Sequence, residues 1–170
     1  MRSIFPILVI LIVSCSVPEP VSTCADEVPS TKWTVLDQVQ LQADIQSIDN
    51  YLDDNGIVAV KHPSGLRYVI TEIGTGVNVP CLENVFSATY EGRLLSNNTI
   101  FDKNSRPAAF ILGGLITGWQ IAFLEFNRGT KATLYIPSGL GYGPNGRYSQ
   151  SSIIPPNANL IFDVQLIDYR

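Results

Sequence analysis

Few side chains in this chain of 170 residues belong to the types that carry out covalent or metal chemistry. His62 is the only histidine, and it precedes Pro63 in an expected surface turn, without a cysteine or acidic partner at motif spacing. Ser138 lacks the glycine two positions earlier that a nucleophile elbow requires. Residues 139–143 are rich in glycine but lack the Lys-Ser/Thr pair of a phosphate-binding loop. Nucleophilic, acid–base and phosphate chemistry therefore have little support, and no cluster offers the ligands of a metal site.

The remaining candidates for a functional site are aromatic and aliphatic. They are Tyr90, Phe101, Phe110, Leu115, Ile116, Trp119, Tyr142, Ile153, Ile154 and Phe162. The pattern alone favours a plain hydrophobic core, but two details favour a binding site. Tyr142, Ile153 and Ile154 lie in or beside an expected loop, where apolar residues need a special reason. Asp102 directly follows Phe101 in an apolar strand, where an acid should be paired or functional.

The segment 110–126 must position several of these side chains. Two glycines, Gly113 and Gly114, end a strand-like run, and Gly118 precedes Trp119 at the start of a short apolar segment. That segment, residues 119–126, is long enough for about two helical turns. Because it has little polar surface, we expect a helix that is buried on most sides, with Trp119 at its entrance.

Strand patterns flank this helix on both sides. Alternating and β-branched residues predict strands at 66–73, 84–95, 100–102, 108–112, 130–137 and 159–168. Residues 96–99 are expected to form a turn, and 138–156 a long loop. The fold class is therefore α+β, with one helix packed against an antiparallel sheet.

Residues 34–56 predict a second, amphipathic helix near the N-terminus. Leu41, Ile45, Ile48 and Leu52 recur at spacings of 4, 3 and 4, which places them on one helical face. This apolar face must pack either on its own domain or on a second copy of the chain. We expect the first arrangement, and therefore a monomer rather than a dimer.

The first 14 residues predict a lipoprotein signal peptide. Arg2 is the only charged residue before Glu19, and residues 4–13 are apolar. This run is too short to span a bilayer but fits the apolar region of a signal peptide. It ends in Ile12-Val13-Ser14-Cys15, which resembles the lipobox of bacterial lipoproteins and predicts lipidation of Cys15. An ordinary secretory signal cleaved nearby is the alternative.

Residues 15–33 predict a lipidated, disordered tether, because they hold three prolines and few apolar side chains. Cys24 and Cys81 are then the two unmodified cysteines. An oxidising envelope allows them to pair, although both could equally remain independent thiols. The acidic balance, with a net charge of −4, argues against binding to nucleic acid or to an anionic membrane surface. The expected membrane attachment is therefore the lipid on Cys15.

Seven motifs together carry a family resemblance. They are Tyr90-Glu91-Gly92, Phe101-Asp102, Phe110-Ile111-Leu112-Gly113, Leu115-Ile116-Thr117-Gly118-Trp119, Leu140-Gly141-Tyr142-Gly143, Ile154-Pro155-Pro156 and Leu160-Ile161-Phe162-Asp163-Val164-Gln165-Leu166. Their order and spacing are similar to those of FKBP-type peptidyl-prolyl cis-trans isomerases, from about Ser64 to the end. The front part of the chain resembles envelope FKBP lipoproteins of Bacteroidetes-type bacteria.

The resemblance implies a domain at 64–170 in which a half-barrel of five to six antiparallel strands wraps around one short helix. It implies prolyl isomerase activity without a cofactor or metal. The implied catalytic residues are Tyr90, Phe101, Asp102, Trp119 and Tyr142. The implied substrate-binding residues are Phe110, Leu115, Ile116, Ile153, Ile154 and Phe162. Trp119 would form the pocket floor, while the Tyr142 hydroxyl and the Ile116 N–H would hold substrate carbonyl groups.

The implied partners are proline-containing polypeptides that are unfolded or partly folded, and macrolide inhibitors are a further implied ligand class. The expected location is the cell envelope, with the lipid in the outer membrane and the protein facing the periplasm. Two departures from the family, Ala108 in place of a second wall aromatic and a longer loop at 144–152, keep one rival function open, a non-catalytic peptide-binding module or holdase chaperone. A carrier of a small ligand in a β-rich pocket is a third interpretation.

Overall fold

The computed structural model describes residues 25–76, 81–149 and 153–169. The predictions for the signal peptide 1–14, for Cys15 and for Cys24 concern residues outside this description. Within it, no helix combines the length and apolar character needed to cross a membrane.

A six-stranded antiparallel sheet forms the body of the protein, which confirms the predicted α+β class. Its strand order is β1-β2-β5-β8-β3-β4. The strands are β1 Val60–Lys61, β2 Arg67–Glu72, β3 Val85–Leu94, β4 Ile100–Ile111, β5 Lys131–Ile136 and β8 Leu160–Tyr169. The central strand β8 pairs with β5 on one side and with β3 on the other.

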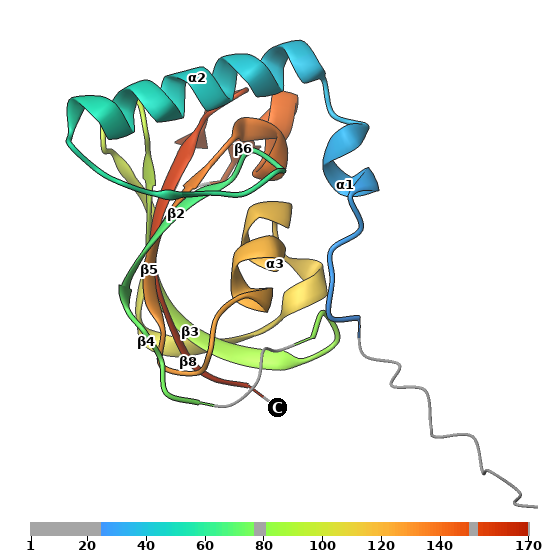
Figure 1. The fold of residues 1–170 in the computed structure, drawn as a ribbon, viewed down its shortest axis with the longest axis vertical. Helices are drawn as coiled ribbons and strands as arrows, with labels where there is room; N and C mark the ends of the chain where they lie inside the picture. The colour runs from blue at the N-terminus through green and yellow to red at the C-terminus, as the bar shows by residue number, and fades with distance from the viewer. Residues whose placement is uncertain (1–24, 77–80, 150–152, 170) are drawn as a thin grey trace, which may run out of the picture.

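The helix α3, Thr117–Leu124, lies on the concave side of this sheet (Figure 1). Every residue from Gly118 to Leu124 is buried, as its apolar composition predicts. The helix begins two residues earlier than predicted, because Ile116 is extended and the turn starts directly after it. A Cβ at Gly118 would lie 2.6 Å from the side chain of Ile136, so a glycine at this position lets α3 approach β5 closely.

The strand β4 runs without interruption where two separate strands, 100–102 and 108–112, were predicted. The middle part of β4 is polar, so its side chains do not predict a strand. These polar residues are tolerated because β4 is an edge strand with one side to solvent. Pro107 is tolerated there because an edge strand does not need every N–H for pairing. Register shifts between Ala88 and Tyr90, and between Gly92 and Arg93, mark irregularities in the pairing of β3 with β4.

The predicted loop 138–156 contains short regular elements. The 3-10 turns η2 Ser138–Leu140 and η3 Gly143–Asn145 are followed by a small ribbon of β6 Arg147–Tyr148 and β7 Ile153–Ile154. A third 3-10 turn, η1 Leu112–Gly114, joins β4 to α3.

The N-terminal helix α2, Gln38–Asp54, begins later than predicted because Asp37 caps it. The Asp37 Oδ1 atom accepts hydrogen bonds from the backbone N–H groups of Val39 (2.9 Å) and Gln40 (3.2 Å). Figure 1 shows α2 lying across one end of the sheet. Ile48 and Leu52 pack there with Leu95, Tyr135 and Ile161, on the face of the sheet turned away from α3. The apolar face of α2 is thus buried on its own domain, while the monomeric state stays a prediction.

The predicted tether includes residues that are in fact part of the folded body. Thr31–Thr34 form a short helix, α1, and Val28 is only 4% exposed in the main core. The backbone N–H of Leu82 donates to the carbonyl of Ala25 (2.9 Å). The tether was predicted from its three prolines and few apolar side chains, which did not reveal the apolar contact of Val28. Cys81 is disulfide-bonded.

We predict that Ile48→Ala lowers the free energy of unfolding by about 2–5 kcal/mol, because it leaves a cavity where α2 meets the sheet. Ile48 has no exposed surface, whereas Val39 on the same helix is 83% exposed. The control Val39→Ala should therefore stay within about 0.5 kcal/mol of the native value. Urea unfolding followed by tryptophan fluorescence measures both, and equal effects would contradict packing of α2 on its own domain.

Candidate functional site

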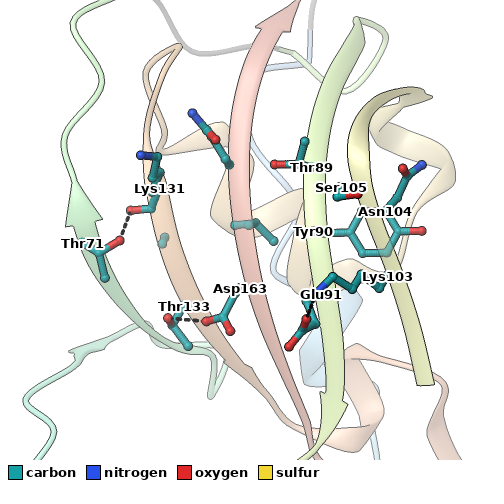
Figure 2. A pocket seen from close by; sticks show the side chains of 13 residues that line it. Thr71, Thr89, Tyr90, Glu91, Lys103, Asn104, Ser105, Lys131, Thr133 and Asp163 are labelled. Atoms are coloured by element: carbon teal, nitrogen blue, oxygen red, sulfur yellow. Dashed lines mark hydrogen bonds and ion pairs between the residues drawn. The ribbon is translucent and has the colours of Figure 1, made fainter. Parts of the chain in front are cut away.

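Two hollows in the structure have different characters. Figure 2 shows the larger one, of about 400 Å³, on the face of the sheet turned away from α3. Several of its polar side chains pair with each other: the Thr133 hydroxyl donates to Asp163 Oδ1 (2.7 Å), and Lys103 forms an ion pair with Glu91. The charged groups Lys103, Glu91 and Asp163 are therefore already paired within the protein.

The smaller cavity, of about 110 Å³, lies between α3 and the concave side of the sheet. The side chains that line it come from β3, β4, β6, β8 and α3, from the segment before α3 and from the loop before β6. They are Tyr90, Asp102, Phe110, Leu115, Ile116, Trp119, Tyr142, Arg147 and Phe162. Eight of these nine were predicted as site residues, so the sequence identified most of the lining.

Trp119 forms the floor of this pocket. Its ring is 4% exposed, stacks on Phe123 at 5.1 Å, and meets the rings of Tyr90 and Phe162 at 5.4 and 5.2 Å in edge-to-face geometry. These contacts fix the plane of the indole. The indole Nε1 atom is buried and has no hydrogen-bond partner within the described residues. The face of the indole ring is therefore a rigid apolar floor, and its N–H is an unpaired donor among the described residues.

Tyr90 and Asp102 form a polar pair at the pocket. The Tyr90 hydroxyl donates to Asp102 Oδ2 at 3.0 Å. Burial, followed by this hydrogen bond to a carboxylate, raises the pKa of Tyr90 to about 12. The phenol therefore stays protonated at physiological pH, and its proton holds the Asp102 carboxylate in one orientation.

Arg147 was not predicted as a site residue, yet its guanidinium lies beside Tyr142. Arg147 Nη1 donates to the Tyr142 hydroxyl oxygen at 3.3 Å, and the guanidinium carbon lies 5.6 Å from the centre of the Tyr142 ring. The hydroxyl proton of Tyr142 is then directed elsewhere, which makes it available to a ligand. One signal could have revealed this residue: Arg147 is the single charged residue in the segment 138–156.

Ile116 contributes its backbone as well as its side chain. It caps α3 in an extended conformation, and its own N–H donates no hydrogen bond within the described part of the chain. The backbone N–H groups at a helix start lack partners inside the helix and are ready donors for a ligand carbonyl. The carbonyl-binding role of Ile116, which the family resemblance implies, stays a prediction.

Three predicted site residues do not line the pocket. Phe101 is buried behind Phe162, with the ring centres 5.4 Å apart, because Gly92 leaves room for both rings. Ile154 is 2% exposed and belongs to the core, whereas Ile153 is 62% exposed. The β6–β7 ribbon explains this alternation, since it turns successive side chains to opposite faces. Phe101 thus supports the pocket wall from behind rather than touching a ligand.

His62 is half-buried rather than on the surface as predicted. Its ring meets Trp33 edge-to-face at 5.7 Å, and its Nδ1 atom accepts the backbone N–H of Ser64 (3.1 Å). Burial lowers the pKa of His62, which opposes a charge at neutral pH. These packing and hydrogen-bond contacts explain the presence of His62 without a catalytic role. Among the described residues, no group of three or more His, Cys, Asp and Glu side chains is arranged to hold a metal.

A curved antiparallel sheet around one short helix, with an aromatic pocket between them, defines the FKBP-like class of proteins. The family model described as FKBP-type peptidyl-prolyl cis-trans isomerase matches residues 80–167. The chain therefore belongs to this family.

Known proteins show the same similarity. A probable FKBP-type peptidyl-prolyl cis-trans isomerase FkpA of Neisseria meningitidis serogroup B is 40% identical over 107 residues, which are 61% of this chain and 38% of that protein. The outer membrane protein MIP of Legionella longbeachae is 36% identical over 118 residues, 68% of this chain and 48% of that protein. The chain thus spans less than half the length of these relatives.

A solved structure of a peptidyl-prolyl cis-trans isomerase from Pseudomonas syringae pv. tomato is similar in fold. It superposes with a TM-score of 0.65 at 26% identity. The match covers 84% of this chain and 97% of that one. The similarity therefore extends N-terminally beyond residues 80–167, the part that the family model matches.

We predict that Tyr90 titrates near pH 12, and that Asp102→Asn lowers this pKa but leaves it above 10, because burial is the larger cause. A raised pKa of the folded state means that the stabilisation is complete below pH 10 and is lost as the pH rises toward 12. The measurement is tyrosinate absorbance, as the difference between each protein and its Tyr90→Phe counterpart. Titration of Tyr90 at pH 10 would contradict the observed burial and pairing.

Proposed function

We propose that this protein is a peptidyl-prolyl cis-trans isomerase that accelerates X–Pro rotation in folding proteins of the cell envelope. The observation that carries the proposal is the pocket itself: an apolar aromatic floor, Trp119, beside the Tyr142 hydroxyl and the Ile116 N–H, which donates to no group among the described residues. The substrates are proline-containing polypeptides that are unfolded or partly folded.

Rotation about an X–Pro bond needs no nucleophile and no metal, because no covalent bond breaks. The barrier of about 18–20 kcal/mol comes from loss of amide resonance. The planar amide has a charge-separated form that water stabilises, whereas the twisted amide has lost this form. A dry pocket therefore favours the twisted state over the planar state, and such differential binding is the requirement for catalysis.

Each pocket residue has a proposed role in this step. The prolyl ring rests on Trp119, between the walls formed by Phe110, Phe162 and Leu115. The Tyr142 hydroxyl and the Ile116 N–H donate hydrogen bonds to substrate carbonyl groups, which hold one side of the amide while the other rotates. Tyr90 and Asp102 form the polar edge, and Asp102 turns a carboxylate toward the twisting amide. Phe101 holds the Phe162 wall in place.

The proposed location is the cell envelope, with lipid on Cys15 anchoring the protein in the outer membrane so that the folded domain faces the periplasm. The lipobox-like Ile12-Val13-Ser14-Cys15 supports this proposal. So does the name of the Legionella longbeachae relative, outer membrane protein MIP. Slow X–Pro isomerisation, which takes tens to hundreds of seconds, limits protein folding in any compartment.

We predict that the full chain accelerates cis-to-trans relaxation of a prolyl peptide, and that Tyr142→Phe lowers kcat/KM about 3- to 10-fold. The loss corresponds to one hydrogen bond worth about 0.5–1.5 kcal/mol. Asp102→Ala should reduce kcat/KM to a similar extent, because it frees the Tyr90 hydroxyl. The measurement is the relaxation rate after a solvent jump.

Matched substitutions outside the pocket serve as controls for this assay. Tyr148→Phe changes a 66% exposed tyrosine, and Asp168→Ala removes an exposed carboxylate that pairs with Arg128. Both should leave kcat/KM unchanged. If the unaltered protein gives no acceleration, the isomerase proposal fails. Binding of the same peptide without acceleration would then favour the non-catalytic peptide-binding module or holdase.

We also predict that Cys15 carries the lipid. Cells that produce the full chain and grow on labelled palmitate should incorporate label into the native protein and into Cys24→Ser, but not into Cys15→Ser. Label that persists in Cys15→Ser would rule out this site, and an unlabelled native protein would favour an ordinary secretory signal.

A further inference from the structure

A buried carboxylate joins the N-terminal helix to the segment that carries Tyr142. Asp44 on α2 is 3% exposed. Its Oδ2 atom accepts hydrogen bonds from the backbone N–H of Ser138 (2.9 Å) and from the Ser138 hydroxyl (2.6 Å). Its Oδ1 atom accepts the side-chain amide of Gln40 at 2.8 Å. Burial of a carboxylate is costly unless hydrogen bonds replace the lost water, so these three donors define its position.

Asp44 has no cationic partner among the ion pairs of the described residues. The neighbouring acid on α2, Asp49, is different: it forms an ion pair with Arg67 at 2.9 Å and lies closer to solvent. A buried acid that is held only by hydrogen bonds depends strongly on where its donors lie. The interaction of Asp44 with Ser138 is therefore specific in geometry rather than a general attraction of charges.

Ser138 begins the pocket loop, which we define as residues 138–148. This loop contains Tyr142 and Arg147, two of the pocket-lining side chains. Leu140 is fully buried and anchors the loop close to Ser138. Tyr142 follows only two residues later, so a shift at Ser138 is transmitted to its ring through a short stretch of backbone. Figure 1 shows α2 above the part of the chain that contains β6.

The far half of the loop is held differently. The N–H of Asn157 donates to the carbonyl of Gly143 (3.0 Å), and a Cβ at Gly146 would lie 2.2 Å from the carbonyl oxygen of Ile154. These contacts lie inside the family-matched region 80–167. At the other end, the Ser138 N–H is shared between Asp44 Oδ2 and Asn159 Oδ1 (3.1 Å), and only Asp44 also accepts the Ser138 hydroxyl. The contact from Asp44 thus comes from outside the family-matched region and helps to fix this end of the loop.

We propose that Asp44 is a positioning residue for the isomerase reaction, which fixes the start of the pocket loop so that the Tyr142 hydroxyl meets the substrate carbonyl. The inference rests on the proposed isomerase function. Asp44 does not line the pocket, so its effect on catalysis must pass through the loop. The N-terminal helix is thereby a part of the active-site framework and not only a cover for the sheet.

The test compares kcat/KM of the full chain with that of Asp44→Ala, Ser138→Ala and Asp44→Asn on a prolyl peptide. Asp44→Ala should lose up to about 3- to 10-fold, the loss expected for Tyr142→Phe, because it displaces the hydroxyl that makes the same hydrogen bond. Ser138→Ala keeps the N–H donor and should lose less. Asp44→Asn keeps an acceptor for Ser138, and the Gln40 amide can rotate to match it, so activity should largely return. Native kcat/KM in Asp44→Ala overturns the proposal.

A double-mutant cycle separates positioning from general loss of stability. In the Tyr142→Phe background, Asp44→Ala should have little further effect on kcat/KM, because both changes remove the same hydrogen bond. Additive effects would overturn the proposed route through Tyr142. Ile48→Ala is the matched control on α2: it weakens the packing of the same helix but leaves the Asp44–Ser138 contact, and kcat/KM of the folded protein should not change.

Amide hydrogen exchange provides a readout that does not require activity. Asp44→Ala should increase exchange within residues 138–148, whereas Ile48→Ala should not do so selectively. If the native protein proves inactive, the isomerase proposal fails while this measurement still decides whether Asp44 orders the loop. Unchanged exchange in Asp44→Ala overturns the positioning role, whether or not the native protein is active.

Discussion

The burial of α3 is the constraint on which the rest of the structure depends. This helix has almost no polar surface, and a helix of only eight residues is marginal in water by itself. It is stable because a strongly curved sheet encloses it. The curvature brings β3, β4 and β8 around its N-terminal end, where Trp119 lies. The same enclosure that stabilises the helix thus creates a dry aromatic surface, and the pocket is the part of the core that the sheet leaves open.

The opposite face of the sheet is covered in part by a different helix, α2. Near one end, Tyr135 and Ile161 point away from α3 and require an apolar cover, which α2 supplies through Ile48 and Leu52. Toward the other end the same face carries paired polar side chains and stays open to solvent (Figure 2). The helix α2 also contacts the pocket side of the molecule. Asp44, one helical turn before Ile48, accepts hydrogen bonds from Ser138. One helix therefore connects the back of the sheet with the loop at its front.

The sequence predicted what local patterns determine. The apolar segment of α3, the alternation of β2, β3, β5 and β8, and the amphipathic face of α2 each follow from side chains a few positions apart. The family motifs added most of the pocket lining. The predictions were wrong where contacts between residues far apart in the sequence determine the structure. The polar middle of β4 is tolerated only because that strand is at the edge, and Val28 is buried only because Ala25 pairs with Leu82. Phe101 lies behind the wall because Gly92, on the neighbouring strand, makes room for it.

The order of the strands has a consequence for how such a protein is made. The strand β8 lies between β5 and β3 but is the last of the six in chain order. A chain that is synthesised N-terminus first therefore presents two half-sheets whose central edges are unpaired. The concave wall around Trp119 cannot close until residues 160–169 arrive. Proteases would act on this interval, and a prematurely terminated chain would present open strand edges instead of a finished pocket.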